Sequence, residues 1–307
     1  MMDGILNVLK PPGMTSFDVI AYLRKVLGTR KIGHTGTLDP EATGVLPLCI
    51  GRATKAVEFL VEKDKTYRAE LTLGITTDTC DSTGNVLRES NEIPLREEII
   101  NVVHSFKGIQ KQIPPMYSAI SINGVRLYKL AREGKVVERE PREVAIHSID
   151  VIDFLSDRKL LIDVKCSKGT YIRTLCADIG EKLGCGAHMS YLLRLASGNF
   201  KIENALTLEE IADLSAKKKL ELIPVYEALK DYNEIKLWGK TLKRYINGEK
   251  IQCNDMPETY KHPLKYPLYV NVFSESKEFI GVGEIIEKNG QFFIKSKKLF
   301  NTNSGDE

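Results

Sequence analysis

Strand-like and helix-like stretches follow one another irregularly along this chain, and that order is the strongest constraint on its fold. Residues 67–73 alternate apolar and polar side chains, as a half-buried strand does, and residues 159–165 repeat the pattern. Between them, residues 95–107 carry apolar side chains at helical spacing. A doubly wound parallel sheet needs regular alternation of strands and helices, so we predict an α+β fold instead. We expect a mixed, largely antiparallel sheet flanked by helices.

Further elements follow from local signals. Residues 4–9 predict a short buried strand, which Pro11 and Pro12 end. Thr15 or Ser16 then caps a helix that ends at Gly28. Residues 31–47 are rich in Gly, Pro and Thr and predict an elaborate loop.

The chain continues with two more predicted helices and a change of character. One helix follows residues 169–171 and ends at Gly184, and another starts with a capping box at Thr207 and runs to about Leu222. At roughly 100–200 residues per domain, 307 residues suit two domains. Residues 232–300 hold β-like stretches and Asn-Gly turn signals, so we place a small, mostly β domain there, with a frayed tail over 301–307.

Composition excludes several classes of protein. The chain is 42% hydrophobic and 28% charged, which is ordinary for a globular protein and excludes wholesale disorder. It has no apolar run approaching ~18 residues and no basic start followed by an apolar stretch, so we expect neither membrane insertion nor secretion. The six cysteines form no C-x-x-C pair and predict reduced thiols in a cytoplasmic protein without a zinc site.

Charge is unevenly distributed although its sum is only +3. Residues 58–103 hold 5 Lys/Arg and 10 Asp/Glu, a local charge of −5. Residues 104–142 and 158–201 each hold 8 Lys/Arg and 3 Asp/Glu, a local charge of +5. Such blocks are expected of a protein that binds a polyanion with one face. The local charge of solvent-exposed faces also varies this much by chance, so charge alone leaves both interpretations open.

The densest candidate for chemistry is the run Gly-His-Thr-Gly-Thr-Leu-Asp-Pro at residues 33–40. Its glycines permit unusual backbone angles or close approach of another molecule. Asp39, held in extended geometry by Pro40, is either the N-cap of an element that Pro40 begins or a fixed carboxylate able to act as nucleophile or base. Taken alone, His34 is more typical of an ordinary loop histidine than of a catalytic one.

A second candidate is Gly-Thr-Tyr-Ile-Arg at residues 169–173. On a strand, Tyr171 and Arg173 would point to one face, and an arginine beside a carboxylate keeps it ionised and orients it. Tyr67, at the start of a strand, is either a core residue or a residue that presents the face of its ring to a nucleobase. Residues 114–135 mix cations with aromatics, which suits single-stranded nucleic acid as well as an ordinary exposed helix.

Other reaction classes lack their motif. The sequence has no Ser-His-Asp pattern, no metal-ligand spacing and no G-x-G-x-x-G between a strand and a helix. Hydride transfer, phosphoryl transfer from a nucleotide and metal-dependent hydrolysis are therefore disfavoured, and we expect neither a cofactor nor a metal.

Five stretches together resemble the bacterial TruB-type tRNA pseudouridine-55 synthases, in that family's order. They include Lys-Pro-Pro-Gly-Met at residues 10–14, the Asp39 run, Pro-Met-Tyr-Ser-Ala at 115–119 and the Arg173 run, and their ranges are 4–16, 33–46, 65–69, 113–134 and 167–195. The resemblance covers roughly residues 1–228 and implies a catalytic domain there. Residues 232–300, with Gly281-Val282-Gly283-Glu284, look like the family's small RNA-binding PUA barrel.

The resemblance implies isomerisation of uridine 55 in the TΨC loop of tRNA, with no cofactor and with the target nucleotide flipped out of its stack. The family's catalytic aspartate falls on Asp39, and Arg173 matches the arginine that pairs with it. Whether the carboxylate adds to the base or to the sugar stays open.

The remaining matched residues surround the base. Tyr67 and Tyr171 match residues that hold it, Tyr67 also being a candidate for proton handling, and Leu192 matches an apolar wall of the pocket. His34 matches the residue that enters the loop where the base has left.

The resemblance also bears on partners. Residues 114–142 correspond to an insertion that clamps the tRNA arm, which favours a stand-alone enzyme over guide-RNA-dependent relatives; nothing demands more than a monomer. Two rival functions stay open: a tRNA-binding protein without essential catalysis, and a sugar-processing enzyme, which would need a second positioned acid that the sequence does not reveal.

Overall fold

Two separate sheets form the framework of the computed structural model, which describes residues 2–118, 120–122, 124–253 and 268–301. The larger sheet has nine strands in the order β1-β3-β12-β4-β11-β10-β7, with β2 paired to β3 and β13 to β12. Its ladders are antiparallel apart from a short parallel one between β12 and β3. The strands are β1 (Gly4–Lys10), β2 (Ile32–His34), β3 (Thr43–Ile50), β4 (Lys65–Leu73), β7 (Gly108–Gln112), β10 (Arg142–Phe154), β11 (Lys159–Cys166), β12 (Ala187–Ser197) and β13 (Phe200–Lys201). The predicted α+β class is confirmed.

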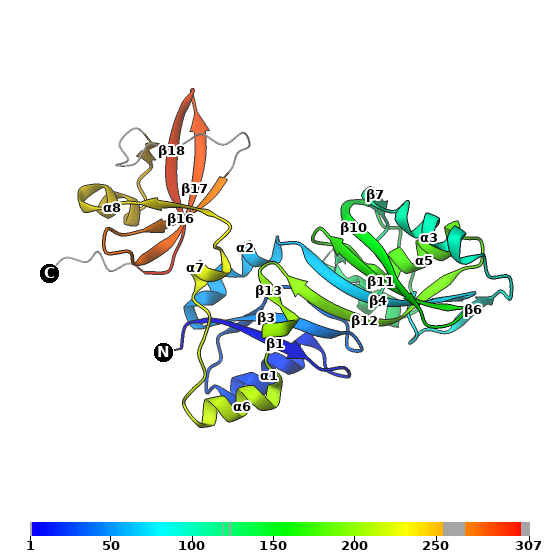
Figure 1. Ribbon diagram of the computed structural model, residues 1–307. Helices are drawn as coiled ribbons and strands as arrows, with labels where there is room; N and C mark the ends of the chain where they lie inside the picture. Colours follow the sequence, from blue (N-terminus) through cyan, green and yellow to red (C-terminus); the bar gives the residue numbers. More distant parts are fainter. Residues whose placement is uncertain (1, 119, 123, 254–267, 302–307) are drawn as a thin grey trace.

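Helices cover this sheet at both ends (Figure 1). Near β10 and β11, α3 (Arg96–His104) and α5 (Ile172–Lys182) bury apolar side chains in one cluster with β4, β11 and β12. Near β1, α1 (Ser16–Val26) and α6 (Leu208–Ala216) form a second cluster with β1 and β3. Short helical turns, η1 (Gly51–Ala56), α2 (Val57–Val61), η2 (Ile202–Asn204) and α7 (Val225–Ala228), link the larger elements.

The predicted helix starts are confirmed by their caps. Thr15 is the N-cap of α1 in a capping box with Asp18, and Thr207 caps α6 with Glu210 in the same way. The predicted end of α6 at about Leu222 is wrong, because the helix stops at Ala216 and Lys218 takes the left-handed conformation (φ +57°) that no regular helix contains.

Two further expectations are corrected by the structure. Residues 31–47 are only partly loop, because β2 pairs with β3 and leaves residues 35–42 as the connection. The segment around Tyr171 and Arg173 is not a strand: β11 ends at Cys166, the chain turns through Gly169 (φ +78°), and Tyr171 becomes the N-cap of α5. Arg173 therefore projects from the first turn of a helix.

The second sheet has five strands in the order β14-β16-β17-β18-β15 and forms the half-barrel at one end of Figure 1. Its elements are β14 (Asn233–Lys236), α8 (Gly239–Ile246), β15 (Ile251–Gln252), β16 (Leu268–Phe273), β17 (Phe279–Lys288) and β18 (Gln291–Leu299). Asn289 and Gly290 (φ +55° and +73°) form the two-residue turn between β17 and β18 that the sequence signalled. Helix α8 was not expected. This sheet fits the predicted PUA-like domain; residues 254–267 and 302–307, the latter most of the predicted tail, lie outside the described residues.

The second sheet contacts η1 and α2, which follow β3, through aromatic rings, an ion pair and a hydrogen bond. Phe59 of α2 packs edge-on against Tyr269 of β16, with ring centroids 5.3 Å apart. Lys298 of β18 lies 2.9 Å from Glu58, and Lys55 donates to the carbonyl of Leu299 at 2.7 Å. All six cysteines are free thiols, and no helix among the described residues is both long and apolar enough to cross a membrane.

Candidate active site

The loop of residues 35–42 carries Asp39 and is held through its main chain. The Ser16 hydroxyl, at the start of α1, accepts from the Leu38 amide at 2.9 Å, and the Gly13 amide donates to the carbonyl of Pro40 at 3.0 Å. The Ala42 amide closes a turn on the carbonyl of Asp39 at 3.1 Å. Because no helix begins at Pro40, the interpretation of Asp39 as an N-cap is wrong.

Lys10 supports the same loop through hydrogen bonds to main-chain carbonyls. The sequence did not predict this role. The residue is fully buried, and its ammonium donates to the carbonyls of Pro11, Pro40 and Ala42 at 2.8, 2.9 and 2.7 Å. Three acceptors around one ammonium satisfy its donors and hold the main chain that directly follows Asp39. The available signal was a lysine ending a buried strand directly before two prolines.

Arg173 pairs with Asp39 through two nitrogens. Its Nε lies 2.9 Å from Oδ2 of Asp39, and its Nη2 donates to Oδ1 at 3.2 Å. The arginine side chain is 5% exposed and the aspartate side chain 41% exposed, so the guanidinium is buried behind a carboxylate that solvent or a ligand can reach. Bidentate pairing fixes the orientation of the carboxylate as well as its charge.

Asp81, a second carboxylate on Arg173, was also missed. It follows β5 (Ile75–Thr77), in the connection to β6 (Val86–Glu89), and its Oδ2 lies 3.5 Å from Nη1 of Arg173. Its Oδ1 accepts from the hydroxyls of Thr79 and Thr83 at 2.7 and 2.6 Å. The side chain is 14% exposed. A turn-forming run of Thr, Asp and Gly was the only sequence signal.

Competing influences set the proton affinity of Asp39. Burial in the site is the largest and raises the pKa of its carboxyl, and the negative charge of Asp81 adds to this. Arg173 and Lys10 oppose the rise through their positive charges. The carboxylate is therefore ion-paired and yet a better proton acceptor than an exposed aspartate.

Tyr67 and Leu192 lie on neighbouring strands of the sheet behind this pair. Tyr67 is on β4 and Leu192 on β12; they are 9% and 7% exposed, and they share a buried cluster with Leu38 and Ile172, the chain neighbours of Asp39 and Arg173. The structure thus gathers the predicted apolar wall and one predicted tyrosine close to the ion pair.

Arg194 is the ladder partner of Tyr67 across β12 and β4 and is 1% exposed. It donates to the carbonyls of Val45 in β3 and of Gly36 at 2.6 and 3.2 Å, which ties the start of the Asp39 loop to the sheet. Burial raises the pKa of the Tyr67 phenol, while the charge of Arg194 and its hydrogen bond to the phenol oppose that rise.

Tyr171 and His34 occupy two different margins of the site. Burial raises the pKa of the half-buried Tyr171 phenol, and the positive charges of Arg142 and Arg173 oppose the rise. His34 ends β2, and its Nδ1 accepts from the Gly36 amide at 3.3 Å. Burial, reinforced by the charge of Arg194, lowers the pKa of His34, so its ring is neutral near pH 7. His34 thus bonds within the Asp39 loop.

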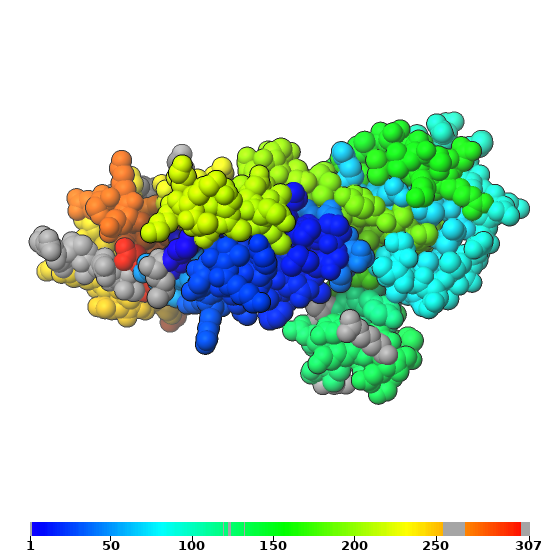
Figure 2. Space-filling view, turned by 90° about the horizontal axis from the view of Figure 1, so that it is seen from below, coloured from blue at the N-terminus to red at the C-terminus, as the bar shows by residue number. Residues whose placement is uncertain are grey.

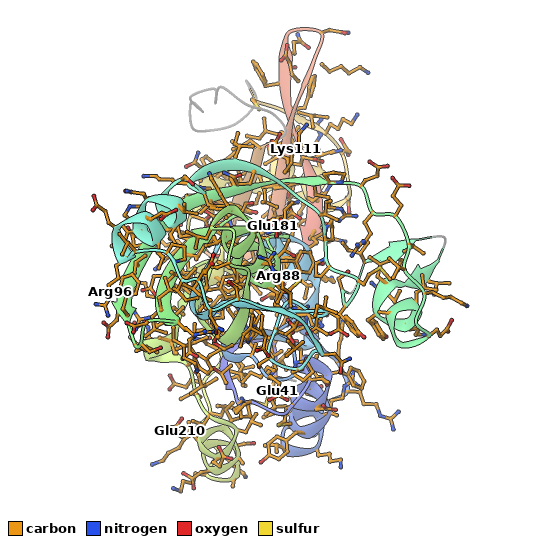
Figure 3. All side chains as sticks on the ribbon, turned by 90° about the vertical axis from the view of Figure 1, so that its right-hand side faces the viewer. Glu41, Arg88, Arg96, Lys111, Glu181 and Glu210 are labelled. Carbon is orange, nitrogen blue, oxygen red and sulfur yellow. The ribbon has the colours of Figure 1, made fainter. Side chains whose placement is uncertain are left out.

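The predicted clamp segment projects from the body of the molecule. Figures 2 and 3 show that the part between β7 and β10 projects away from the larger sheet. It contains β8 (Ser121–Ile122), β9 (Val125–Arg126) and α4 (Leu127–Arg132), while Ala119 and Asn123 lie outside the described residues. Near its base, the carbonyl of Tyr117 accepts from Nη2 of Arg173 at 2.8 Å. The segment therefore contacts the ion pair directly.

Two other kinds of candidate site are a metal-binding cluster and a surface groove beside α3. Among residues 2–253 and 268–301, apart from 119 and 123, no group of three or more His, Cys, Asp or Glu is placed to hold a metal ion. An open groove of about 400 Å³ is lined by α3 and by Lys182 at the far end of α5 from Arg173, so it is no part of the site.

Two family models match the chain in succession. Residues 24–172 match the TruB family pseudouridylate synthase N-terminal domain, and residues 173–232 match the tRNA pseudouridylate synthase B C-terminal domain. The tRNA pseudouridine synthase B of Alkaliphilus oremlandii is 48% identical over 299 residues, which cover 97% of this chain and 98% of that protein. The protein of the same name from Clostridium perfringens strain SM101 is 45% identical over 288 residues, 94% of this chain and 96% of that protein.

Two solved structures are similar to this chain over nearly its whole length. A chain of a Cbf5-Nop10-Gar1 complex superposes with a TM-score of 0.77 at 28% identity, covering 97% of this chain and 85% of that one. A chain of an H/ACA RNP bound to a substrate RNA containing 2'-deoxyuridine superposes with a TM-score of 0.75 at 25% identity, with the same coverage. The two consecutive domain matches and the nearly full-length relatives confirm the predicted resemblance: the chain belongs to the TruB family of pseudouridylate synthases.

Proposed function

We propose that this protein converts uridine 55 in the TΨC loop of tRNA into pseudouridine, with Asp39 as the catalytic carboxylate. The observation that carries the proposal is the bidentate pair between Asp39 and the buried Arg173, whose carboxylate side remains open. The relatives named tRNA pseudouridine synthase B support the substrate class, and the order of the five matching stretches supports the position.

The reaction breaks the glycosidic bond at N1 of the uracil, turns the base, and joins the sugar to C5; C5 loses its proton and N1 takes one up, so the product is an isomer of the substrate. Asp39 acts as the nucleophile, on either the base or the sugar, and Arg173 keeps it ionised and oriented. The uracil must leave its stack to reach the carboxylate, at a cost of a few kcal/mol.

Surrounding side chains receive the flipped base. Leu192 and the ring of Tyr67 supply an apolar wall at the ion pair, and Tyr171 a second ring at the start of α5. The Tyr67 phenol is the candidate for handling the C5 proton, because Arg194 bonds to it and offsets part of the effect of burial. His34, neutral on the Asp39 loop, is placed to fill the space that the base leaves in the RNA.

The remaining parts of the chain supply tRNA contacts in this proposal. The projecting segment 114–142 clamps the TΨC arm, and the five-stranded domain of residues 232–300 adds a second RNA-binding surface. The enzyme works as a monomer in the cytoplasm, without a guide RNA or a cofactor. Asp81 does not act as the second acid of a glycosidase, since its oxygens are occupied by Thr79, Thr83 and Arg173.

The test uses a tRNA transcript whose uridines carry tritium at C5. Joining the sugar to C5 expels the label into water, so the wild-type chain should release about one equivalent per tRNA. Release should vanish when the TΨC-loop uridine is replaced and when the protein carries Asp39→Asn.

A matched control is available in the same sheet. Asp163 forms a bidentate pair with Arg68, with distances of 2.7 and 2.8 Å, away from the site. Asp163→Asn should leave release unchanged. Tight tRNA binding by the wild-type chain without release would instead favour a binding protein without catalysis, and release by Asp39→Asn would refute the catalytic role of Asp39.

A further inference from the structure

The side-chain amide of Gln112 makes two hydrogen bonds to the main chain of Tyr171, a contact that no sequence pattern predicted. It is the last residue of β7 and is 5% exposed. Its Oε1 accepts from the Tyr171 amide at 2.7 Å, and its Nε2 donates to the Tyr171 carbonyl at 3.0 Å. One side-chain amide thus satisfies both polar groups of one residue, as a neighbouring strand would.

The residue held in this way is the one from which α5 starts. Tyr171 is the N-cap of α5, and its side chain makes no capping hydrogen bond to the helix. Arg173 lies two residues further, in the first turn. A helix is stiff and rises 1.5 Å per residue, so a shift of Tyr171 passes to the Cα of Arg173 almost undiminished.

Gln112 also marks the base of the projecting segment. It is the ladder partner of Arg142, so the chain leaves the larger sheet at Gln112 and returns to it at Arg142. Inside the segment, the Tyr117 carbonyl accepts from Nη2 of Arg173 at 2.8 Å. The base of the segment and the start of α5 are therefore joined through two residues, Gln112 and Tyr117.

We propose that Gln112 is a positioning residue of the reaction, which holds the start of α5 so that Arg173 presents two nitrogens to Asp39. This inference rests on the proposed catalytic roles of Asp39 and Arg173. Gln112 is buried and contacts neither carboxylate, so it acts through Tyr171 and not on the substrate. Its loss should slow the chemical step and leave tRNA affinity unchanged.

Gln112→Leu is the first test, measured by tritium release in a single turnover at saturating tRNA. We expect a rate roughly 10–100-fold below wild type, because a small misplacement of a catalytic group has effects of that size. Affinity for tRNA, measured in an Asp39→Asn background to prevent turnover, should change by less than about twofold, since no substrate contact is lost. The control is Gln110→Leu. Gln110 lies on the same strand and donates to the carbonyl of Phe106 at 3.1 Å, so its loss should change neither quantity.

Gln112→Glu separates positioning from packing because it keeps the shape of the side chain. When ionised, the introduced carboxyl can accept from the Tyr171 amide but cannot donate to the Tyr171 carbonyl; when protonated, it can do both. The ratio of its rate to the wild-type rate should therefore rise as the pH falls from about 8.5 to about 6. Arg142 is the ladder partner of this position, and the charged groups near Tyr171 are Arg142, Arg173 and Asp39; all of them are present in both enzymes, so the ratio isolates the effect of the introduced carboxyl.

Three outcomes would overturn the inference. They are a wild-type rate for Gln112→Leu, equal losses of rate and affinity, and a flat pH ratio for Gln112→Glu. If thermal unfolding shows that Gln112→Leu does not fold, the pH ratio decides alone, with Gln110→Glu as its flat control. Each of these leaves the role of Asp39 intact, whereas release of tritium by Asp39→Asn would refute the proposed function itself.

Discussion

Two loops each present one aspartate to Arg173, and they hold that aspartate in opposite ways. In the loop after β5, Asp81 is held by its own neighbours, because the hydroxyls of Thr79 and Thr83 saturate one carboxylate oxygen. In loop 35–42 the support is given to the main chain by Lys10 and Ser16, and the hydrogen bonds to the Asp39 carboxylate from the described residues come from Arg173 alone.

The difference in how the two carboxylates are held distinguishes a structural carboxylate, Asp81, from a reactive one, Asp39. Asp81 is 14% exposed, its Oδ1 accepts from two hydroxyls and its Oδ2 lies 3.5 Å from Nη1 of Arg173, so it can fix Arg173 but is largely shielded from a ligand. Asp39 is 41% exposed and keeps one side open. A nucleophile needs an unoccupied lone pair and a fixed position, and only the second loop provides both.

The largest expected effect is that of Asp39→Asn. It should lower the single-turnover rate by roughly 10⁴-fold or more, as loss of a nucleophile does in other enzymes. The amide retains shape and one acceptor for Arg173, so the urea midpoint of unfolding should stay close to that of the wild type. A large loss of stability with a modest loss of rate would reverse the distinction between the two loops.

Asp81→Asn should have an intermediate effect on rate. Losing the second charge on Arg173 loosens the guanidinium, and we expect a rate about 10–100-fold lower in single turnover, with tRNA affinity in a filter-binding assay unchanged. A loss as deep as that of Asp39→Asn would show that the two carboxylates are not separable.

The same variant should move the pH profile. The ionised Asp39 is the reactive form, so the rate falls as the pH drops through its pKa, which lies above 3.8 because of burial and Asp81. Removing the charge of Asp81 lowers that pKa, so the acidic limb of Asp81→Asn should move to lower pH. Arg173→Met should move it to higher pH, because the opposing positive charge is lost.

Lys10→Met tests the main-chain support of loop 35–42. Three carbonyls lose their common donor, and we expect a loss of unfolding free energy of about 2–4 kcal/mol in urea titrations, with about a tenfold lower rate. Lys55→Met is the control, because Lys55 donates to a single carbonyl at an exposed position. Full activity and stability of Lys10→Met would refute this account of the loop.

Thr79→Val should have the smallest effect. It removes one of the hydroxyls on Asp81 and leaves Thr83 in place, so we expect a loss of stability of about 0.5–1.5 kcal/mol and a rate within about threefold of wild type. Thr77→Val is matched to it, because the Thr77 hydroxyl donates to the main-chain carbonyl of Asp81 at 2.7 Å and not to the carboxylate. Thr79→Val should raise the rotational freedom of Arg173 more than Thr77→Val, which side-chain NMR of the guanidinium can measure.

Sequence reasoning succeeded where the information is local. Alternation over β4 and β11, the capping boxes at Thr15 and Thr207, and the turn at Asn289 are each set by neighbouring residues. It failed where distant segments decide. Asp39 and Arg173 are 134 residues apart, and no local pattern indicates that a helix rather than a strand brings the arginine to the carboxylate.

The missed residues have the same explanation. Lys10 and Asp81 are defined by what surrounds them in the folded chain: carbonyls from two segments in one case, an arginine from α5 in the other. Neither the strand end nor the Thr-rich turn that carries them has a distinctive local pattern. Gln112 is a third example, because its partner lies 59 residues away.

The pairing of Gln112 with Arg142 has a consequence for how this molecule could have evolved. Since the chain departs and returns at two residues that already face each other in one ladder, everything between them can be lengthened, shortened or exchanged for a tight turn while every other strand keeps its register. The projecting segment could therefore be gained or lost in a single insertion or deletion, and the sheet would fold with or without it. Grafting the segment onto a homologous sheet would exploit the same junction.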